Sequence, residues 1–306
     1  MNSAASNAVL IGIDWGTSSL RAYLIDEKGD VIDKISSAEG IINVKNQAFK
    51  QVLERLISPW VSERDLPILA SGMISSRNGW VETPYLHLPI DANGLANSLL
   101  RHNLSENRSI YFVTGASNSD YLEPDVMRGE ETQIVAASSI GLVDGTFVLP
   151  GTHSKWIQVK NGKIANFSTY MTGEIFGALK ENTILGAMME DSEFDEEIFR
   201  NGVAVGFNGA DKLLNRLFHV RTLSLFGRLS KTSTADYMSG ILIGAEVASN
   251  ACRESRLGTI SIIGDSDLVI RYKIAIEYAG LKSQIYSGDI VAKGHFLIAK
   301  EAGLLT

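Results

Sequence analysis

The sequence contains very little cysteine, which limits the chemistry that can stabilise its fold. Only one of the 306 residues is a cysteine, Cys252. A single thiol cannot form a disulfide within the chain, and such scarcity is typical of proteins in reducing compartments. Cys252 lies in a predicted helix, where a buried structural thiol is a better interpretation than a nucleophile.

Long apolar runs are also absent. No window approaches the roughly 18 apolar residues that a membrane-spanning helix needs, and the apolar segment 240–245 is interrupted by Glu246. Residues 1–8 are mostly small and polar and carry no basic residue, so they do not predict a signal peptide. These two absences predict a cytoplasmic protein with no membrane partner.

The chain has no excess of positive charge, since its formal net charge is −7. This balance disfavours nucleic acid or an anionic membrane as the main partner. A small anionic substrate needs only a local patch of positive charge and remains compatible with the composition. The chain is 45% apolar and 21% charged, as in ordinary globular proteins, and its length predicts one large or two medium domains.

Residues 9–26 form the first informative motif, an apolar strand, a small-residue turn with one acid, and a second strand. Gly16, Thr17 and Ser18 can bring backbone N–H groups and hydroxyls close to an anion. Asp14 beside them would repel a bare phosphate, so we infer a metal ion between the acid and the phosphate. A plain hairpin turn, with Asp14 as a turn former, explains this stretch equally well.

The same order of strands and helices is predicted twice along the chain. In the first half we expect strands and helices within residues 9–26, 31–37, 47–57, 67–73, 109–115 and 130–139. In the second half we expect strands at residues 146–150, 155–159, 164–171, 259–264 and 281–286. We expect helices from Thr172 as an N-cap, around 210–218 and 235–252, and at 267–279 and 289–302. Each half therefore begins with a hairpin, and the second hairpin turn is at residues 151–154.

This repetition predicts a two-domain α/β protein with duplicated β-β-β-α-β-α-β-α units around a central cleft. We place the N-terminal domain at residues 1–130 and the C-terminal domain at 131–306. No linker separates them, so the helix after Arg128 is expected to join them. If the units are related by a pseudo-two-fold axis, the two turns face each other and grip a polyphosphate in the cleft.

Several strings along the chain are similar to those of known proteins. DWGTSSLR (14–21) and PGTHSKW (150–156) resemble the phosphate motifs of the sugar kinase, actin and Hsp70 ATPase superfamily. Three further strings resemble the 2-dehydro-3-deoxygalactonokinase family over nearly the whole chain: SGMISSRNGWVETPYLHLP (71–89), VMRGEETQIVAA (126–137) and SGILIGAEVAS (239–249). The resemblance implies a ribonuclease H-like, actin-like ATPase fold.

The resemblance also implies how the nucleotide is bound. Asp14 matches the acid that holds Mg²⁺, often through water. Gly264 stands where the adenosine motif places glycines, although the usual pair is here Gly264 followed by Asp265. The remaining matches are to phosphate-contacting positions of two loops. The loop of the N-terminal domain supplies Gly16, Thr17, Ser18 and Arg21. The loop of the C-terminal domain supplies Gly151 and Thr152.

The proton acceptor is also assigned from the resemblance. Gly129-Glu130 occupies the place of a Gly-Asp pair in related sugar kinases, whose Asp is the catalytic base. This match implies Glu130 as the base, with Glu131 and Asp14 as alternatives. Without the resemblance, Glu130 and Glu131 are better explained as acids at a helix start, where the helix dipole favours them.

A polar loop at residues 75–80 follows a buried strand and is a candidate for binding the substrate. Ser75 begins the loop. Arg77 suits a carboxylate, Asn78 suits hydroxyls, and Trp80 offers a flat wall to a sugar chain. Simple packing under a long loop explains Trp80 equally well.

Two residues of the second turn have open roles. Lys155 could meet either a phosphate or the carboxylate of a sugar acid. His153 has no other ligand at metal-site spacing, so a hydrogen-bonded structural histidine is the better interpretation.

The expected activity is a kinase that uses ATP and Mg²⁺. By resemblance, it phosphorylates 2-dehydro-3-deoxy-D-galactonate at the 6-hydroxyl in galactonate or galactose catabolism. One alternative is a kinase of the same fold for another sugar or sugar acid. A nucleotide-dependent scaffold is a second, and a homodimer is left open.

Overall fold

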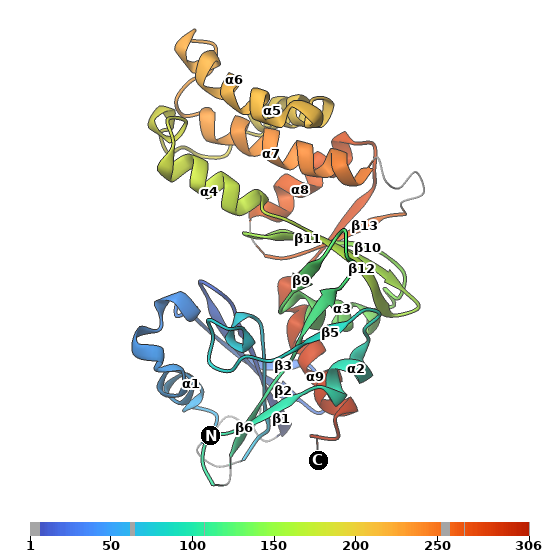
Figure 1. Ribbon diagram of the computed structural model, residues 1–306. Helices are drawn as coiled ribbons and strands as arrows, with labels where there is room; N and C mark the ends of the chain where they lie inside the picture. The colour runs from blue at the N-terminus through green and yellow to red at the C-terminus, as the bar shows by residue number, and fades with distance from the viewer. Residues whose placement is uncertain (1–6, 62–64, 107, 252–257, 266, 306) are drawn as a thin grey trace. The chain divides into compact units, whose positions relative to one another are not determined.

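The computed structural model describes residues 7–61, 65–106, 108–251, 258–265 and 267–305 (Figure 1). The chain forms two compact units. Unit 1 comprises Met1–Asp144, Gln158–Phe167 and Gly288–Thr306, and unit 2 comprises Gly145–Ile157 and Ser168–Ser287. These units follow packing and divide the chain differently from the boundary at residue 130, which stays a prediction. Cys252 lies outside the described residues.

A six-stranded sheet with the order β3-β2-β1-β4-β7-β6 forms the centre of unit 1. The first three strands pair antiparallel, whereas β1, β4 and β7 run parallel. Parallel strands are covered on both faces, which explains why the apolar runs of β1 and β4 are almost entirely buried. The strands are β1 (Ala8–Trp15), β2 (Leu20–Asp26), β3 (Val31–Ser37), β4 (Ile68–Ser71), β6 (Leu100–Asn103) and β7 (Ser109–Phe112).

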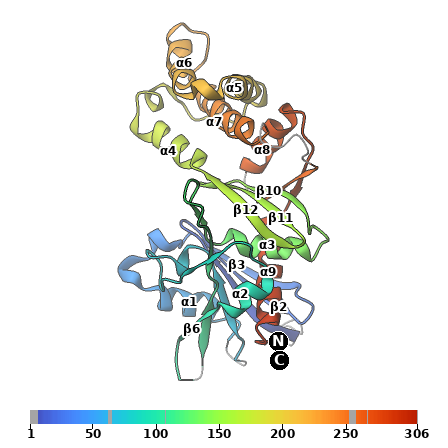
Figure 2. The ribbon, with the colours of Figure 1, turned by 45° about the vertical axis from the view of Figure 1, so that its right-hand side comes forward.

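Four α-helices and a small second sheet complete the described part of unit 1. Helices α3 and α9 come from distant parts of the chain but pack in direct contact (Figure 2), and a Cβ added to Gly294 would lie 2.0 Å from the carbonyl oxygen of Thr132. The helices are α1 (Phe49–Ile57), α2 (Ala92–Asn97), α3 (Glu130–Ser138) and α9 (Val291–Glu301). The three-stranded sheet consists of β5 (Tyr85–His87), β8 (Gly115–Asn118) and β9 (Asp125–Met127).

Unit 2 contains most of a five-stranded sheet with the order β12-β11-β10-β13-β14. Its strands β10, β13 and β14 run parallel, as β1, β4 and β7 do in unit 1. The order matches β3-β2-β1-β4-β7 position by position, which confirms the predicted duplication of the strand pattern. The strands are β10 (Gly145–Leu149), β11 (Ser154–Lys160), β12 (Lys163–Tyr170), β13 (Ile260–Ile263) and β14 (Ser283–Tyr286).

Helices form the rest of unit 2, and α7 lies at their centre. Helix α7 is apolar around most of its circumference because α4, α5, α6 and α8 all contact it. It crosses α5 at glycines, since a Cβ on Gly202 would lie 2.2 Å from the carbonyl oxygen of Tyr237. The helices are α4 (Thr172–Asn182), α5 (Glu196–Asn208), α6 (Leu213–Leu225), α7 (Thr234–Ala251) and α8 (Asp267–Tyr278).

One predicted helix start is wrong. Thr172 is the first residue of α4 and not its N-cap, which is Met171. The Thr172 hydroxyl instead donates to the buried carboxylate of Glu246, a partner 74 residues away. Among the helices of the described ranges, none combines the length and apolar character needed to cross a bilayer.

Candidate active site

The turn between β1 and β2 carries a pair of opposite charges. Asp14 and Arg21 face each other in the strand register, and Nη1 of Arg21 lies 3.5 Å from Oδ2 of Asp14. The N–H of Gly16 donates to the carbonyl oxygen of Ser19 at 2.9 Å and closes the turn. Thr17 and Ser18 are exposed at its tip, where their hydroxyls are accessible to a ligand.

A neighbouring segment fixes the shape of this turn. The N–H groups of Ile41 and Ile42 donate to the carbonyl oxygens of Gly16 and Thr17. Gly40 lies so close that an added Cβ would be 2.3 Å from the carbonyl carbon of Ser18. The tip therefore has a defined backbone before any ligand binds.

The surroundings of Asp14 disfavour its negative charge. Burial raises its pKa, Arg21 opposes that effect, and the negative charges of Glu130 and Asp289 raise the pKa further. Two other carboxylates of unit 1 therefore act on Asp14 at the end of β1. A divalent cation would relieve this repulsion, so the charges present fit Mg²⁺. Within the described ranges, no group of three or more His, Cys, Asp or Glu side chains is arranged to bind a metal directly.

Asp289 is held by two partners on β2 and β3. The Tyr23 hydroxyl donates to its Oδ1 at 2.9 Å, and Nζ of Lys34 lies 2.6 and 2.7 Å from its two oxygens. Partial burial works against the charge of Asp289, but these hydrogen bonds outweigh it and lower its pKa. Asp289 therefore keeps its negative charge at neutral pH.

Glu130 and Glu131 begin α3 but face different surroundings. Glu130 is half-buried, and its Oε2 accepts a hydrogen bond from the N–H of Arg128 at 3.1 Å. Glu131 is fully buried, and its Oε2 accepts from the N–H of Gly129 at 2.7 Å. Burial, together with the charge of Glu130, raises the pKa of Glu131 to about 8. Of the two carboxylates, Glu130 is the one that solvent can reach.

The loop after β4 is fixed by Arg128. Its Nη1 donates to the hydroxyls of Ser75, at 3.0 Å, and of Thr83, and its Nη2 donates to the carbonyl oxygen of Thr83 at 2.9 Å. The guanidinium also lies 4.3 Å from the ring centroid of Tyr85. Ser75 is fully buried and donates to the carbonyl oxygen of Val113 at 3.0 Å, so its side chain is occupied within the protein.

The other predicted substrate residues differ in exposure. Arg77 and Asn78 are exposed at the loop tip. Trp80 is partly buried against the core of unit 1, with its ring centroid 5.8 Å from that of Phe112 and 5.3 Å from that of His102. Trp80 therefore packs against the core, as one of its two interpretations expected. A contact between Trp80 and a sugar stays a prediction. Lys155 belongs to unit 2 and is buried on β11.

The second small-residue turn, between β10 and β11, lies against the start of α4. The N–H of Glu174 donates to the carbonyl oxygen of Thr152 at 2.9 Å. A Cβ on Gly173 would lie 2.5 Å from the carbonyl oxygen of Gly151, so the turn and the helix are in close contact. His153 pairs with Glu174 at 2.6 Å, which is the structural role expected of it.

A buried carboxylate supports this second turn. Glu246 of α7 is only 3% exposed and accepts hydrogen bonds from four side chains of β11, α4 and α8. The donors are Ser154 Oγ at 2.8 Å, Trp156 Nε1 at 2.7 Å, Tyr272 OH at 2.7 Å and Thr172 Oγ1. Burial raises the pKa of Glu246, although the four hydrogen bonds oppose that effect.

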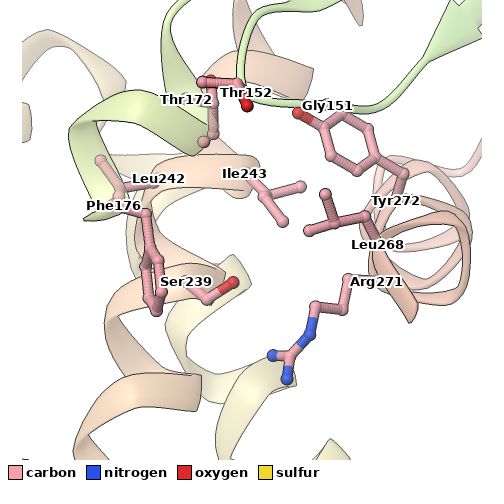
Figure 3. A pocket seen from close by; sticks show the side chains of 11 residues that line it. Gly151, Thr152, Thr172, Phe176, Ser239, Leu242, Ile243, Leu268, Arg271 and Tyr272 are labelled. Carbon is pink, nitrogen blue, oxygen red and sulfur yellow. The ribbon is translucent and has the colours of Figure 1, made fainter. Parts of the chain in front are cut away.

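A cavity of about 280 Å³ opens beside the second turn. Figure 3 shows Gly151 and Thr152 at one end, Leu268, Arg271 and Tyr272 of α8 along one side, and Phe176 of α4 opposite. Apolar walls that end at a small-residue turn suit a flat apolar group joined to an anion. Gly264 is not among the lining residues. It directly follows β13, and its N–H donates to the carbonyl oxygen of Tyr286 at 3.1 Å.

The sequence of residues 14–298 matches the family model of 2-keto-3-deoxy-galactonokinase. The chain belongs to the 2-keto-3-deoxy-galactonokinase family. A 2-dehydro-3-deoxygalactonokinase of Escherichia coli strain K12 is 32% identical over 280 residues, which cover 91% of this chain and 93% of the relative. The family assignment made from the sequence strings is therefore confirmed.

Solved structures confirm the fold of this family member. A Sinorhizobium meliloti protein assigned as a 2-dehydro-3-deoxygalactonokinase has a TM-score of 0.87 at 30% identity, covering 95% of this chain and 98% of its own. The (R)-2-hydroxyglutaryl-CoA dehydratase component A of Acidaminococcus fermentans has a TM-score of 0.55 at 15% identity, covering 96% and 98%. The predicted ribonuclease H-like, actin-like ATPase fold is confirmed.

Three residues of this kinase were not identified as site residues from the sequence. Arg128 stands within the string VMRGEETQ, directly before Gly129 and Glu130, and this position was the available signal. Glu246 is an isolated acid in an apolar helix, a pattern that indicates a buried polar network. Asp289 gave no signal beyond a helix start, because its partners Tyr23 and Lys34 are more than 250 residues away.

Proposed function

We propose that this protein transfers the γ-phosphoryl group of ATP to the 6-hydroxyl of 2-dehydro-3-deoxy-D-galactonate. The observation that carries the proposal is the group formed by Asp14, Arg21 and Glu130 in a member of a sugar-acid kinase family. Phosphoryl transfer to an alcohol needs positive charge on the phosphates and a carboxylate for the hydroxyl proton. The product is the 6-phosphate of the sugar acid, in galactonate or galactose catabolism.

We assign the proton transfer to Glu130. The substrate oxygen forms a bond to the γ-phosphorus while the bond from that phosphorus to the β–γ bridging oxygen breaks, and ADP leaves. Glu130 accepts the hydroxyl proton. Its partial exposure supports this role, and the burial of Glu131 disfavours the same role for its neighbour.

We assign phosphate and metal binding to the two turns. Asp14 would hold Mg²⁺ through water, and the bound ion would neutralise charge on the phosphates. In unit 1, Gly16, Thr17, Ser18 and Arg21 would donate to phosphate oxygens. In unit 2, Gly151 and Thr152 would do the same, and the cavity beside them would take the adenosine, with Gly264 close to the nucleotide. The apolar walls of that cavity support the assignment.

We assign recognition of the sugar acid to the loop after β4. Arg77 would bind the carboxylate and Asn78 a hydroxyl, and their exposure supports these roles. Ser75 would act by shaping the loop, since its hydroxyl is occupied by Arg128 and Val113. Contacts of Trp80 and Lys155 with the substrate are further proposals. A cytoplasmic location, a homodimer and no role for nucleic acid also remain proposals.

The test is an ADP-release assay across sugar acids and neutral sugars. We expect 2-dehydro-3-deoxy-D-galactonate to give the highest kcat/KM and to depend on Mg²⁺. A higher value for the gluco epimer or for a neutral sugar would reassign the substrate within the same fold. ATP hydrolysis that no sugar accelerates would instead favour the nucleotide-dependent scaffold.

A further inference from the structure

Unit 2 contains a second, larger cavity that the proposed kinase activity does not use. Its volume is about 610 Å³, and it lies among α5, α6 and the beginning of α7. Figure 1 shows these helices side by side, coloured from yellow to orange. Neither of the small-residue turns contributes a lining residue. The cavity is within the size range of small-molecule sites.

The lining of this cavity is basic in a protein that is acidic overall. Arg216, His219 and Arg228 line it, and none of the described Asp or Glu residues does. Arg216 and His219 are three residues apart on α6, so they project from the same face of the helix. The segment 212–228 contains no acidic residue at all. This concentration of donors contrasts with the net charge of −7.

No carboxylate of the described residues neutralises the two arginines of this cavity. In the part of the chain that the structure describes, no carboxylate forms an ion pair with Arg216, His219 or Arg228. Nε of Arg216 is buried and has no acceptor among the described residues. Arg216 packs closely over the backbone of Gly209, where an added Cβ would lie 2.7 Å from that nitrogen. Its guanidinium is therefore held in place without a counter-charge.

The remaining walls of the cavity are suited to a carbon skeleton. Val205, Leu223 and Phe226 provide apolar surface, and Asn208, Thr222 and Tyr237 provide polar groups. A bare phosphate ion would fill only a small part of about 610 Å³. Two guanidinium groups and an imidazole suit a dianion, because arginine binds phosphate through paired hydrogen bonds.

We propose that this cavity is a second ligand site, which binds a small organic phosphate through Arg216, His219 and Arg228. The phosphate supplies acceptors to the two guanidinium groups, and the carbon skeleton lies against Leu223 and Phe226. The site is separate from the nucleotide cavity, since the two have no lining residue in common.

Calorimetric titration of the full chain tests this site, with glucose 6-phosphate as the probe and glucose as the control. The protein is first saturated with a non-hydrolysable ATP analogue, so that the phosphate positions of the kinase site are occupied. We expect glucose 6-phosphate to bind with one molecule per chain and glucose to give no measurable heat. Failure of glucose 6-phosphate to bind, equal binding of glucose, or tighter binding of inorganic phosphate would overturn the proposal.

Variants of α6 and the following segment locate the binding. Arg216→Met and Arg228→Met should each weaken binding by about tenfold or more, as expected for the loss of a charge-assisted hydrogen bond. Arg221→Met is the matched control, because Arg221 lies on the same helix but does not line the cavity. Equal weakening by all three variants would contradict the site. Arg228 is exposed, so its variant keeps the test valid if Arg216→Met fails to fold.

Discussion

The two small-residue turns occupy matching places in the two sheets, yet each is supported differently. The turn of unit 1 carries its charges near the surface, where Asp14 and Arg21 are 21% and 33% exposed. The turn of unit 2 has its carboxylate beneath it, where Glu246 is 3% exposed and satisfied by four donors. A partly exposed charge can act on a ligand, whereas a fully buried and satisfied one can only hold the protein in shape. The same backbone motif is therefore combined with a partly exposed charge pair in one unit and with a buried hydrogen-bond network in the other.

The largest expected effect concerns Glu130, whose charge acts on Asp14 in the turn of unit 1. Replacing it with glutamine removes the proposed proton acceptor, so kcat should fall by about 10²- to 10⁴-fold. Nucleotide affinity, measured by titration with a non-hydrolysable analogue, should stay close to that of the wild type. Glu131→Gln is the matched control: with a pKa of about 8 the buried carboxyl is mostly protonated at neutral pH, so glutamine mimics it. Comparable losses of kcat in both variants would contradict the assignment of Glu130.

The second prediction compares how replacing Glu246 and replacing Asp14 change the free energy of unfolding. Glu246→Ala leaves four buried donors without an acceptor and should lower the free energy of unfolding by about 3–5 kcal/mol. Asp14→Asn should abolish turnover but leave the stability at pH 7 equal to or above that of the wild type, because burial and two neighbouring carboxylates disfavour its charge. Denaturant titrations and the ADP assay measure both quantities. Loss of stability in Asp14→Asn would show that its charge is structural.

Glu131 should give the third effect, a dependence of stability on pH. The native state holds the Glu131 proton up to a pKa of about 8, whereas the unfolded chain releases it near 4.5. The unfolded state therefore binds fewer protons between these values, and the free energy of unfolding falls as pH rises, by at most about 1.4 kcal/mol per pH unit from this group. Glu131→Gln should flatten the profile measured by denaturation between about pH 5 and pH 8. Parallel profiles for the two proteins would show that Glu131 does not hold its proton.

Much of the fold could be predicted from local patterns. The succession of most strands along the chain follows from apolar runs such as residues 9–13, and α1 follows from apolar residues at helical spacing. The small sheet of β5, β8 and β9 was not predicted, because its three- and four-residue strands show no alternation of apolar and polar residues. One predicted strand, 109–115, is in fact interrupted: β7 ends at Phe112 and β8 begins at Gly115.

The site was predictable only where its chemistry is local. Asp14 and Arg21 were both named from one hairpin motif, and the strand register places them opposite each other. The donors to Glu246 are 26 to 92 residues away in the sequence, and no pattern within α7 can identify them. Thr172 shows the same limit, since its hydroxyl was expected to cap its own helix but bonds to Glu246. Long-range hydrogen bonds depend on packing, which a single sequence does not display.

The smallest expected effect tests the link between Asp289 and Asp14. Asp289→Asn removes a negative charge that raises the pKa of Asp14, so the acidic limb of the kcat/KM profile should move to lower pH. The ion pair with Lys34 is about one-third exposed, so its loss should cost no more than about 1 kcal/mol of stability. Lys34→Met is the control of opposite sign, because it leaves the Asp289 charge unopposed and should move the same limb to higher pH. Shifts of the same direction in both variants would mean that the two residues act on the site through its shape and not through charge.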